Sequence, residues 1–154
     1  MKLKITSVIL ACGLLAGCAA KTTTPAPPKT PLQVAVVAEA DIASAIGQIQ
    51  TALIAGNTAG FIPDSVVSQV LSVTVKVAQA DQQVTSITQG LTALTPAQQK
   101  SIAAILPPIS QAISASITSG LIPIKDANTQ AAVRALLVTL QTTVSGLQLA
   151  MGSN

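Results

Sequence analysis

Apolar residues recur four and three positions apart along most of the chain, and this spacing constrains the fold more than any other feature. In an α-helix such a spacing puts the apolar side chains on one side. The longest run contains Val66, Val70, Val73, Val77, Ala80, Val84, Ile87, Leu91 and Leu94. Part of it, "VLSVTVKV", also alternates with period two and is β-branched, which favours a strand. The length of the surrounding pattern outweighs this alternation, so we predict a helix.

Three other segments repeat the spacing, which gives four predicted helices. The first contains Ile42, Ile46, Ile49 and Leu53, and the last contains Val133, Leu137, Leu140, Val144, Leu147 and Met151. The third contains Ile102, Ile105, Ile109, Ile113 and Ile117, which share a face without a strict heptad. Val67 and Leu71 widen the apolar face, so the helices need neighbours on more than one side, from the bundle, a partner or lipid. We predict an all-α four-helix bundle over residues 32–154.

The expected helix starts carry capping residues. Thr30-Pro31-Leu32-Gln33 and Thr95-Pro96-Ala97-Gln98 each place Thr at the N-cap, Pro at the first helical position and Gln at the third. This order is that of a capping box. We also predict that Asp64 and Asp126 cap the second and fourth helices.

The two expected helix joints are similar. Gly60-Phe61-Ile62-Pro63 recurs as Gly120-Leu121-Ile122-Pro123, which indicates two related helical hairpins. The two joints are 60 residues apart, whereas the two Thr-Pro helix starts are 65 residues apart. If the hairpins arose by duplication, they have since gained insertions or deletions. We expect Phe61 to be a hydrophobic plug at the first joint; the alternative is an exposed contact residue.

The third helix contains two adjacent prolines. Pro107 and Pro108 lack the N–H groups that an α-helix uses, and Gly47 occupies the position equivalent to Pro107 in the first hairpin. We predict that the third helix is kinked or broken near Pro107-Pro108, and that the first helix bends more mildly.

The beginning of the chain has the features of a secretion signal. Lys2 and Lys4 precede the apolar stretch "ITSVILACGLLAG", which is too short to span a membrane permanently. Small residues follow it. We therefore predict a signal peptide over residues 1–17.

Leu15-Ala16-Gly17-Cys18 resembles the lipobox of bacterial lipoproteins. The resemblance covers residues 1–18 only, and it implies cleavage between Gly17 and Cys18 and acylation of Cys18. Two or more acyl chains, including palmitate, would hold the protein firmly at a membrane. Cys12 could instead be the cysteine of an earlier lipobox, but the apolar stretch of the signal peptide before it would then be shorter than usual. No cysteine follows Cys18, so a disulfide within the mature chain is excluded.

The resemblance also implies a location. Ala19 follows the cysteine, which is similar to enterobacterial lipoproteins sorted to the outer membrane, facing the periplasm. A Gram-positive host would instead keep the protein on its cytoplasmic membrane. Residues 18–31 contain four prolines and read as a tether between the lipidated cysteine and the bundle.

The composition offers little for catalysis. The sequence has no His, Trp or Tyr, one Phe and 8% charged residues, and the charges after residue 17 nearly balance. Glu39 and Asp41 point in different directions on a helix, so no carboxylate pair is visible. Lys100 and Ser101 are adjacent rather than facing, and both read as solvated, as does Arg134. We expect no enzymatic activity, no cofactor, no metal site and no nucleic-acid binding.

These observations predict a structural or protein-interaction role in the bacterial cell envelope, with an envelope protein or a second copy as partner. Two alternatives stay open. One is a membrane-active or phage-derived lipoprotein, related to superinfection exclusion or lysis. The other is a carrier of an apolar ligand held between the helices.

Overall fold

The structure of the chain, a computed structural model, describes residues 28–152. Its elements are α1 (Pro31–Thr58), α2 (Asp64–Thr88), α3 (Pro96–Ala115), the π-helical turn η1 (Ser116–Gly120) and α4 (Ala127–Gly152). Helices make up 83% of the described residues, which contain no strand. The predicted all-α fold is therefore confirmed, and the β-branched stretch in α2 is helical.

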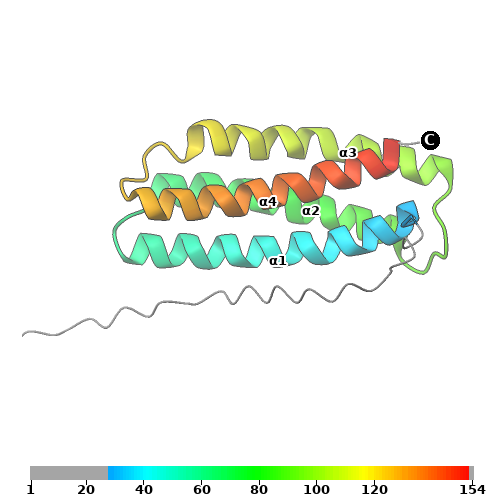
Figure 1. Cartoon of the computed structure of the whole chain (residues 1–154), viewed down its shortest axis with the longest axis horizontal. Coiled ribbons are helices and arrows are strands. Elements are labelled where there is room, and N and C mark those ends of the chain that lie inside the picture. Colours follow the sequence, from blue (N-terminus) through cyan, green and yellow to red (C-terminus); the bar gives the residue numbers. More distant parts are fainter. Residues whose placement is uncertain (1–27, 153–154) are drawn as a thin grey trace, which may run out of the picture.

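The four helices form an antiparallel bundle. α1 packs against α2 and α4, and α3 packs against the same two helices, so the elements close into a ring. The α1–α2 and α3–α4 joints lie at one end, which we call the joint end (Figure 1). The start of α1, the α2–α3 connection and the end of α4 lie at the opposite end, which we call the entry end (Figure 1).

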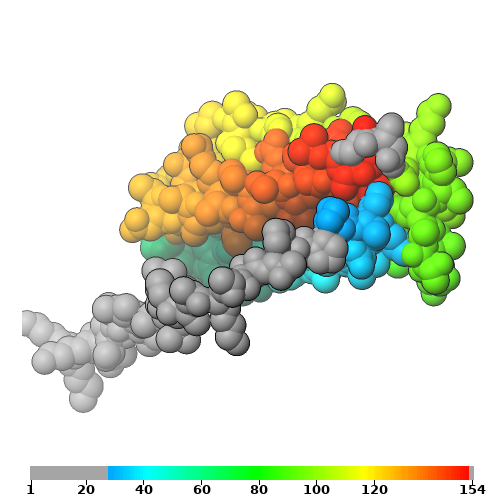
Figure 2. Space-filling view, turned by 45° about the vertical axis from the view of Figure 1, so that its right-hand side comes forward, coloured from blue at the N-terminus to red at the C-terminus, as the bar shows by residue number. Residues whose placement is uncertain are grey.

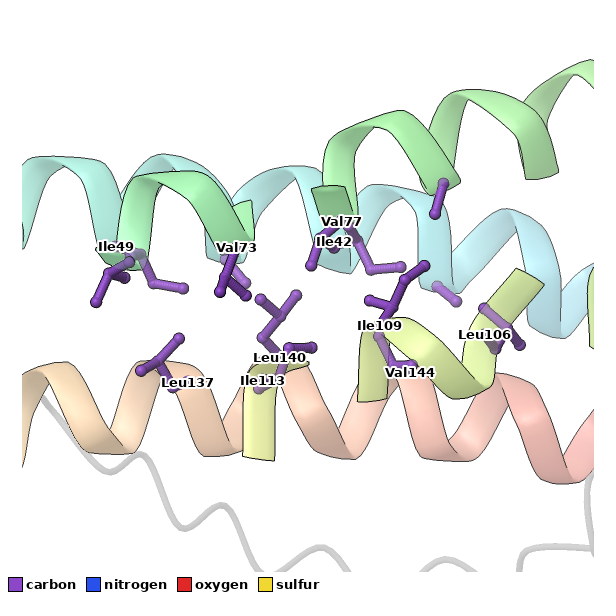
Figure 3. Close-up of a cluster of buried hydrophobic side chains, with 14 of the residues drawn as sticks. Ile42, Ile49, Val73, Val77, Leu106, Ile109, Ile113, Leu137, Leu140 and Val144 are labelled. Atoms are coloured by element: carbon purple, nitrogen blue, oxygen red, sulfur yellow. The ribbon is translucent and has the colours of Figure 1, made fainter. Parts of the chain in front are cut away.

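The core draws apolar side chains from all four helices (Figure 3). All six predicted positions on α4 are buried, and so are the α2 positions from Val66 to Val84. The α2 pattern was extended too far, because α2 ends at Thr88 and Leu91 and Leu94 lie in the connection, half-buried. Gly90, with φ of 74°, ends the helix there in the left-handed conformation that glycine favours.

Three of the four predicted caps are confirmed. Thr30 and Thr95 each form a complete capping box with the Gln three residues later. Oδ1 of Asp126 accepts a 2.7 Å hydrogen bond from the backbone N–H of Thr129 at the start of α4. The prediction for Asp64 is wrong: the N-cap of α2 is Pro63, and Asp64 is the first helical residue.

The first joint is closed by residues on both sides of it. Gly60, with φ of 76°, lets the backbone N–H groups of Phe61 and Ile62 reach the carbonyl oxygen of Gly56. The Asn57 amide donates to the Ile62 carbonyl at 2.9 Å and to Oδ1 of Asp64 at 2.8 Å. The carboxylate that we expected to cap α2 therefore bonds to α1.

The predicted plug at the first joint is wrong by one position. Ile62 is 2% exposed and fills the core, whereas Phe61 is 46% exposed, as in the alternative interpretation. At the second joint the pattern is reversed, because Leu121 is fully buried and Ile122 is 71% exposed. The reason is the different helix ending: α3 passes into η1, and Gly120 lacks the positive φ of Gly60.

α3 continues as one helix through Pro107 and Pro108, so it is not broken there. Its neighbours are Leu106 and Ile109, which are 2% and 7% exposed and are held in the core. Burial of these side chains keeps the helix continuous where two backbone hydrogen bonds are missing. The departure from α geometry comes later, at η1.

Candidate functional site

The predicted lipidation site lies outside the described residues, as do the signal peptide and residues 18–27 of the tether. The described chain starts at Pro28, and α1 begins at Pro31, one residue before the predicted start of the bundle. The tether therefore joins the bundle at the entry end.

The surface between α1 and α4 is hollowed at three places along the two helices, and we call these three hollows together the α1/α4 groove. The first, about 220 Å³, is lined by Lys29, Val34, Val37, Ala38, Asp41, Thr142, Thr143, Gly146 and Leu147. The second, about 320 Å³, is lined by Asp41, Ser44, Ala45, Gln48, Leu136, Thr139 and Thr143. The third, about 310 Å³, is lined by Ala52, Ala55, Gly56, Ala59, Phe61, Thr129, Ala132 and Val133.

Small side chains are frequent in the walls of the groove. Asp41 and Thr143 line both the first and the second hollow, so these two are continuous. Figure 2 shows the first turns of α1, in blue, beside the last turns of α4, in red. The first hollow is lined by residues of these two segments. Lys29 and Asp41 are the charged residues of the groove, and they line the same hollow.

The threonines of the α4 wall have a defined orientation. The hydroxyl groups of Thr139, Thr142 and Thr143 donate to carbonyl oxygens one turn earlier on α4, at 2.9–3.2 Å. With the proton so used, each oxygen keeps lone pairs that accept hydrogen bonds. The α4 wall is therefore lined with hydrogen-bond acceptors.

Two further hollows lie on other faces. One, about 460 Å³, lies between α2 and α3, with Lys76, Gln79 and Gln83 above a floor that includes Ile105 and Ile109. The other, about 330 Å³, lies at the entry end and is lined by Pro96, Gln99, Lys100, Ala103, Met151 and Gly152. Both volumes are in the range of small-molecule sites.

The structure brings together a carboxylate pair that the sequence did not reveal. Thr88 of α2 donates a 2.8 Å hydrogen bond to Oε1 of Glu39 on α1. Oδ1 of Asp81, also on α2, is buried and accepts no hydrogen bond from the described residues. Burial and, to a smaller degree, the charge of Glu39 raise the pKa of Asp81 from 3.8 to about 6.

This pair does not form a catalytic site with any hollow described above, because neither carboxylate lines one. Among residues 28–152 there is no group of three or more His, Cys, Asp or Glu residues that could hold a metal ion. We interpret the pair as a contact between α1 and α2 in which the two carboxylates repel each other, which favours the protonated form of Asp81. Only a three-dimensional arrangement reveals it, since its members are far apart in sequence.

The other residues considered for chemistry are placed on the surface. Lys100, Ser101 and Arg134 are exposed. The Ser101 hydroxyl donates to the carbonyl oxygen of Ala97 in its own helix at 3.0 Å. Asp41 is exposed and lines the α1/α4 groove instead of joining Glu39.

Several large apolar side chains are exposed. They are Val36, Val37, Ile54, Phe61, Val75, Ile122, Val138 and Leu149. Ile54, Phe61 and Ile122 belong to the joint end, with exposed fractions of 65%, 46% and 71%, and we call them the apolar tip. Large apolar side chains left exposed at one end of a bundle are typical of a contact surface.

Three helical segments are long and apolar enough to cross a membrane, by length and composition: Pro31–Thr58, Pro96–Gly120 and Ala127–Gly152. In each, 28% of the most apolar window is buried inside the bundle. Most of each window therefore lies outside the core.

No family model matches the chain, and no curated protein or solved structure is similar to it. The class that the structure defines is an all-α four-helix bundle.

Proposed function

We propose that the chain is a lipid-anchored protein of the bacterial cell envelope with a structural or protein-interaction role. The observation that carries this proposal is the apolar tip on an otherwise weakly reactive bundle. The tip lies at the end opposite to that where the tether enters (Figure 1). A bundle that is held at one end and carries exposed Ile54, Phe61 and Ile122 at the other suits a contact across the envelope.

Phe61 is the main candidate for the contact residue. It is the chain's one aromatic residue, and aromatic side chains are enriched where binding energy concentrates. Its neighbour Ile62 already fills the core, so Phe61 is not needed to close the joint. Exposure of an aromatic side chain beside a filled core favours a role in binding.

The anchor is tested with the two cysteines of the sequence as matched variants. In the host, metabolic labelling with an alkyne analogue of palmitate is expected to mark the protein and its Cys12→Ser variant. Cys18→Ser is expected to lose the label and to remain as the uncleaved precursor, and globomycin is expected to cause the precursor of the unchanged protein to accumulate. A labelled Cys18→Ser variant would refute the anchor.

The contact surface is tested by photo-crosslinking in cells. A photo-reactive amino acid at Phe61 is expected to give a discrete adduct with an envelope protein or a second copy. The same amino acid at Gln82, an exposed position of α2, serves as the control. Equal adducts from both positions, or none from Phe61, would contradict a partner at the apolar tip.

A membrane-active protein is the second candidate, and the three apolar helical segments favour it. In this alternative the bundle opens and its helices enter a bilayer. Vesicles of phosphatidylethanolamine and phosphatidylglycerol distinguish the two candidates when mixed with the mature chain carrying Cys18→Ser. Release of a trapped dye supports the membrane-active role, whereas intact vesicles support the interaction role.

A further inference from the structure

We propose that residues 18–27, the tether segment, bind along the α1/α4 groove of their own bundle as an extended chain. The three hollows of this groove lie in line between the entry end and the joint end. An occupant that is long, narrow and small in its side chains fits such a shape. The tether segment has these properties, and the chain enters at one end of the groove.

The position of Lys29 gives the direction of entry. Lys29 precedes the first residue of α1, yet it lines the same hollow as Val37 and Asp41, which lie two to three turns inside that helix. Lys29 therefore lies over the first turns of α1 on the side that faces α4.

The length of the segment matches that of the groove. From Ala38 in the first hollow to Ala55 in the third, α1 rises ~26 Å at 1.5 Å per residue. Ten residues in polyproline II conformation span ~31 Å at 3.1 Å per residue. The segment therefore reaches from Lys29 to the third hollow with little excess.

The chemistry of the two surfaces is also complementary. The segment reads "CAAKTTTPAP" and consists mostly of small side chains. The groove walls contain Ala45, Ala52 and Gly146, small residues that leave room for a second backbone. A polyproline II chain has no internal hydrogen bonds, so its N–H groups are available to the acceptor oxygens of Thr139 and Thr143.

Binding of the tether would change the position of the anchor. Cys18 would lie near the third hollow, close to Phe61 at the joint end. With the tether bound, the apolar tip would face the membrane that holds the protein and would be unavailable for the contact proposed above. A released tether would free the tip and let the bundle extend up to ~40 Å from the membrane. This consequence rests on the proposed lipid anchor, but binding of the segment in the groove does not.

The test therefore uses the mature chain, residues 18–154, with Cys18→Ser and no lipid. A nitroxide on Thr24→Cys, then the one cysteine of the protein, is expected to broaden the amide signals of Gln48 and Leu136 in the second hollow. Signals of Gln79 and Gln83, which line the hollow on the α2/α3 face, are expected to broaden several-fold less. Even broadening of all four helices would overturn the proposal.

Two glycine variants separate specific binding from proximity. A Cβ at Gly146 or at Gly47 meets nothing within 4 Å, so the bundle tolerates a larger residue at either position. Gly146→Leu fills the first hollow and is expected to reduce the broadening at Gln48 several-fold, whereas Gly47→Leu leaves it unchanged. Equal effects of the two variants would overturn the proposal.

Dilution identifies the occupant. Broadening within one molecule is independent of protein concentration, and this is the expected result. Broadening that disappears on dilution would show that a second copy occupies the groove, which would also overturn the proposal. Because the protein in these experiments carries no acyl chain, neither result bears on lipidation, which the palmitate labelling tests separately.

Discussion

Ile62 occupies the space beside Gly56 so closely that a Cβ on Gly56 would lie 2.5 Å from Cδ1 of Ile62. The two residues belong to opposite sides of the first joint, since Gly56 is in the last turns of α1 and Ile62 precedes α2. Their contact fixes how α1 turns into α2. A glycine inside a helix costs stability, and here the close approach explains its presence.

The first prediction concerns this contact. Gly56→Ala is expected to lower the free energy of unfolding by about 1–3 kcal/mol, because the added methyl group displaces Ile62 from the core. Gly47→Ala is the matched control, since its Cβ has open space. It is expected to raise stability by about 0.5–1 kcal/mol. Urea unfolding followed by circular dichroism measures both, and loss of the difference would contradict the contact.

The second prediction concerns the two joints. Leu121→Ala is expected to cost about 2–5 kcal/mol, because Leu121 is fully buried, whereas Ile122→Ala costs little. At the first joint the order is reversed, so Ile62→Ala is costly and Phe61→Ala is mild. Thermal unfolding of the four variants gives the measurement. The same order at both joints would show that the helix endings are alike after all.

The third prediction concerns pH. Because the pKa of Asp81 is raised from 3.8 to about 6, the native state holds its proton at pH values where the unfolded state has lost it. The contribution of Asp81 to the free energy of unfolding is therefore fully present below pH 3.8 and is lost as the pH rises to about 6. At pH 7, Asp81→Asn is expected to be more stable by roughly 1 kcal/mol, after allowance for solvent screening.

Urea unfolding between pH 4 and about 7 checks this prediction. Glu39→Gln is expected to weaken the pH dependence without abolishing it, since burial is the larger cause of the raised pKa and Glu39 the smaller. An Asp81→Asn variant whose stability falls with pH as steeply as that of the wild type would assign the dependence to other groups.

The fourth prediction concerns the cap of α4. Hydrogen bonds from the Thr129 side chain and backbone lower the pKa of Asp126. This group therefore stabilises the protein above its ordinary pKa, and its contribution is lost as pH falls below 3.8. Asp126→Ala is expected to lower the stability of the protein, whereas Asp126→Asn keeps the acceptor oxygen and most of the stability. Equal losses in calorimetry would argue against a capping role.

The sequence was sufficient for features that depend on neighbouring residues. The capping boxes at Thr30 and Thr95, the buried face of α4 and the glycine stop at Gly60 all follow from local spacing, and the structure confirms them. Asp64 shows the limit of this reasoning, because its carboxylate is bound by Asn57 on the preceding helix. The local sequence predicted that Asp64 caps α2, but its hydrogen bond to Asn57 across the joint determines where the carboxylate lies.

Features that depend on how the helices pack were not accessible from the sequence. Phe61 is exposed, whereas Leu121, at the equivalent position of the second joint, is buried. This difference follows from the π-helical turn before the second joint, which the similar joint sequences do not indicate. The pairing of Glu39 with Asp81 depends on how α1 and α2 are positioned relative to each other along the axis of the bundle. The α1/α4 groove depends in the same way on which small residues of two distant helices lie opposite each other.

The adjacent prolines of α3 divide that helix into two hydrogen-bonded segments. Without N–H groups on Pro107 and Pro108, the carbonyl oxygens of Ala103 and Ala104 lose their usual helical donors. Side chains such as Leu106 and Ile109 hold the two halves in line. When the molecule is pulled from its ends, α3 is therefore expected to part at its middle sooner than a helix with a complete set of backbone hydrogen bonds.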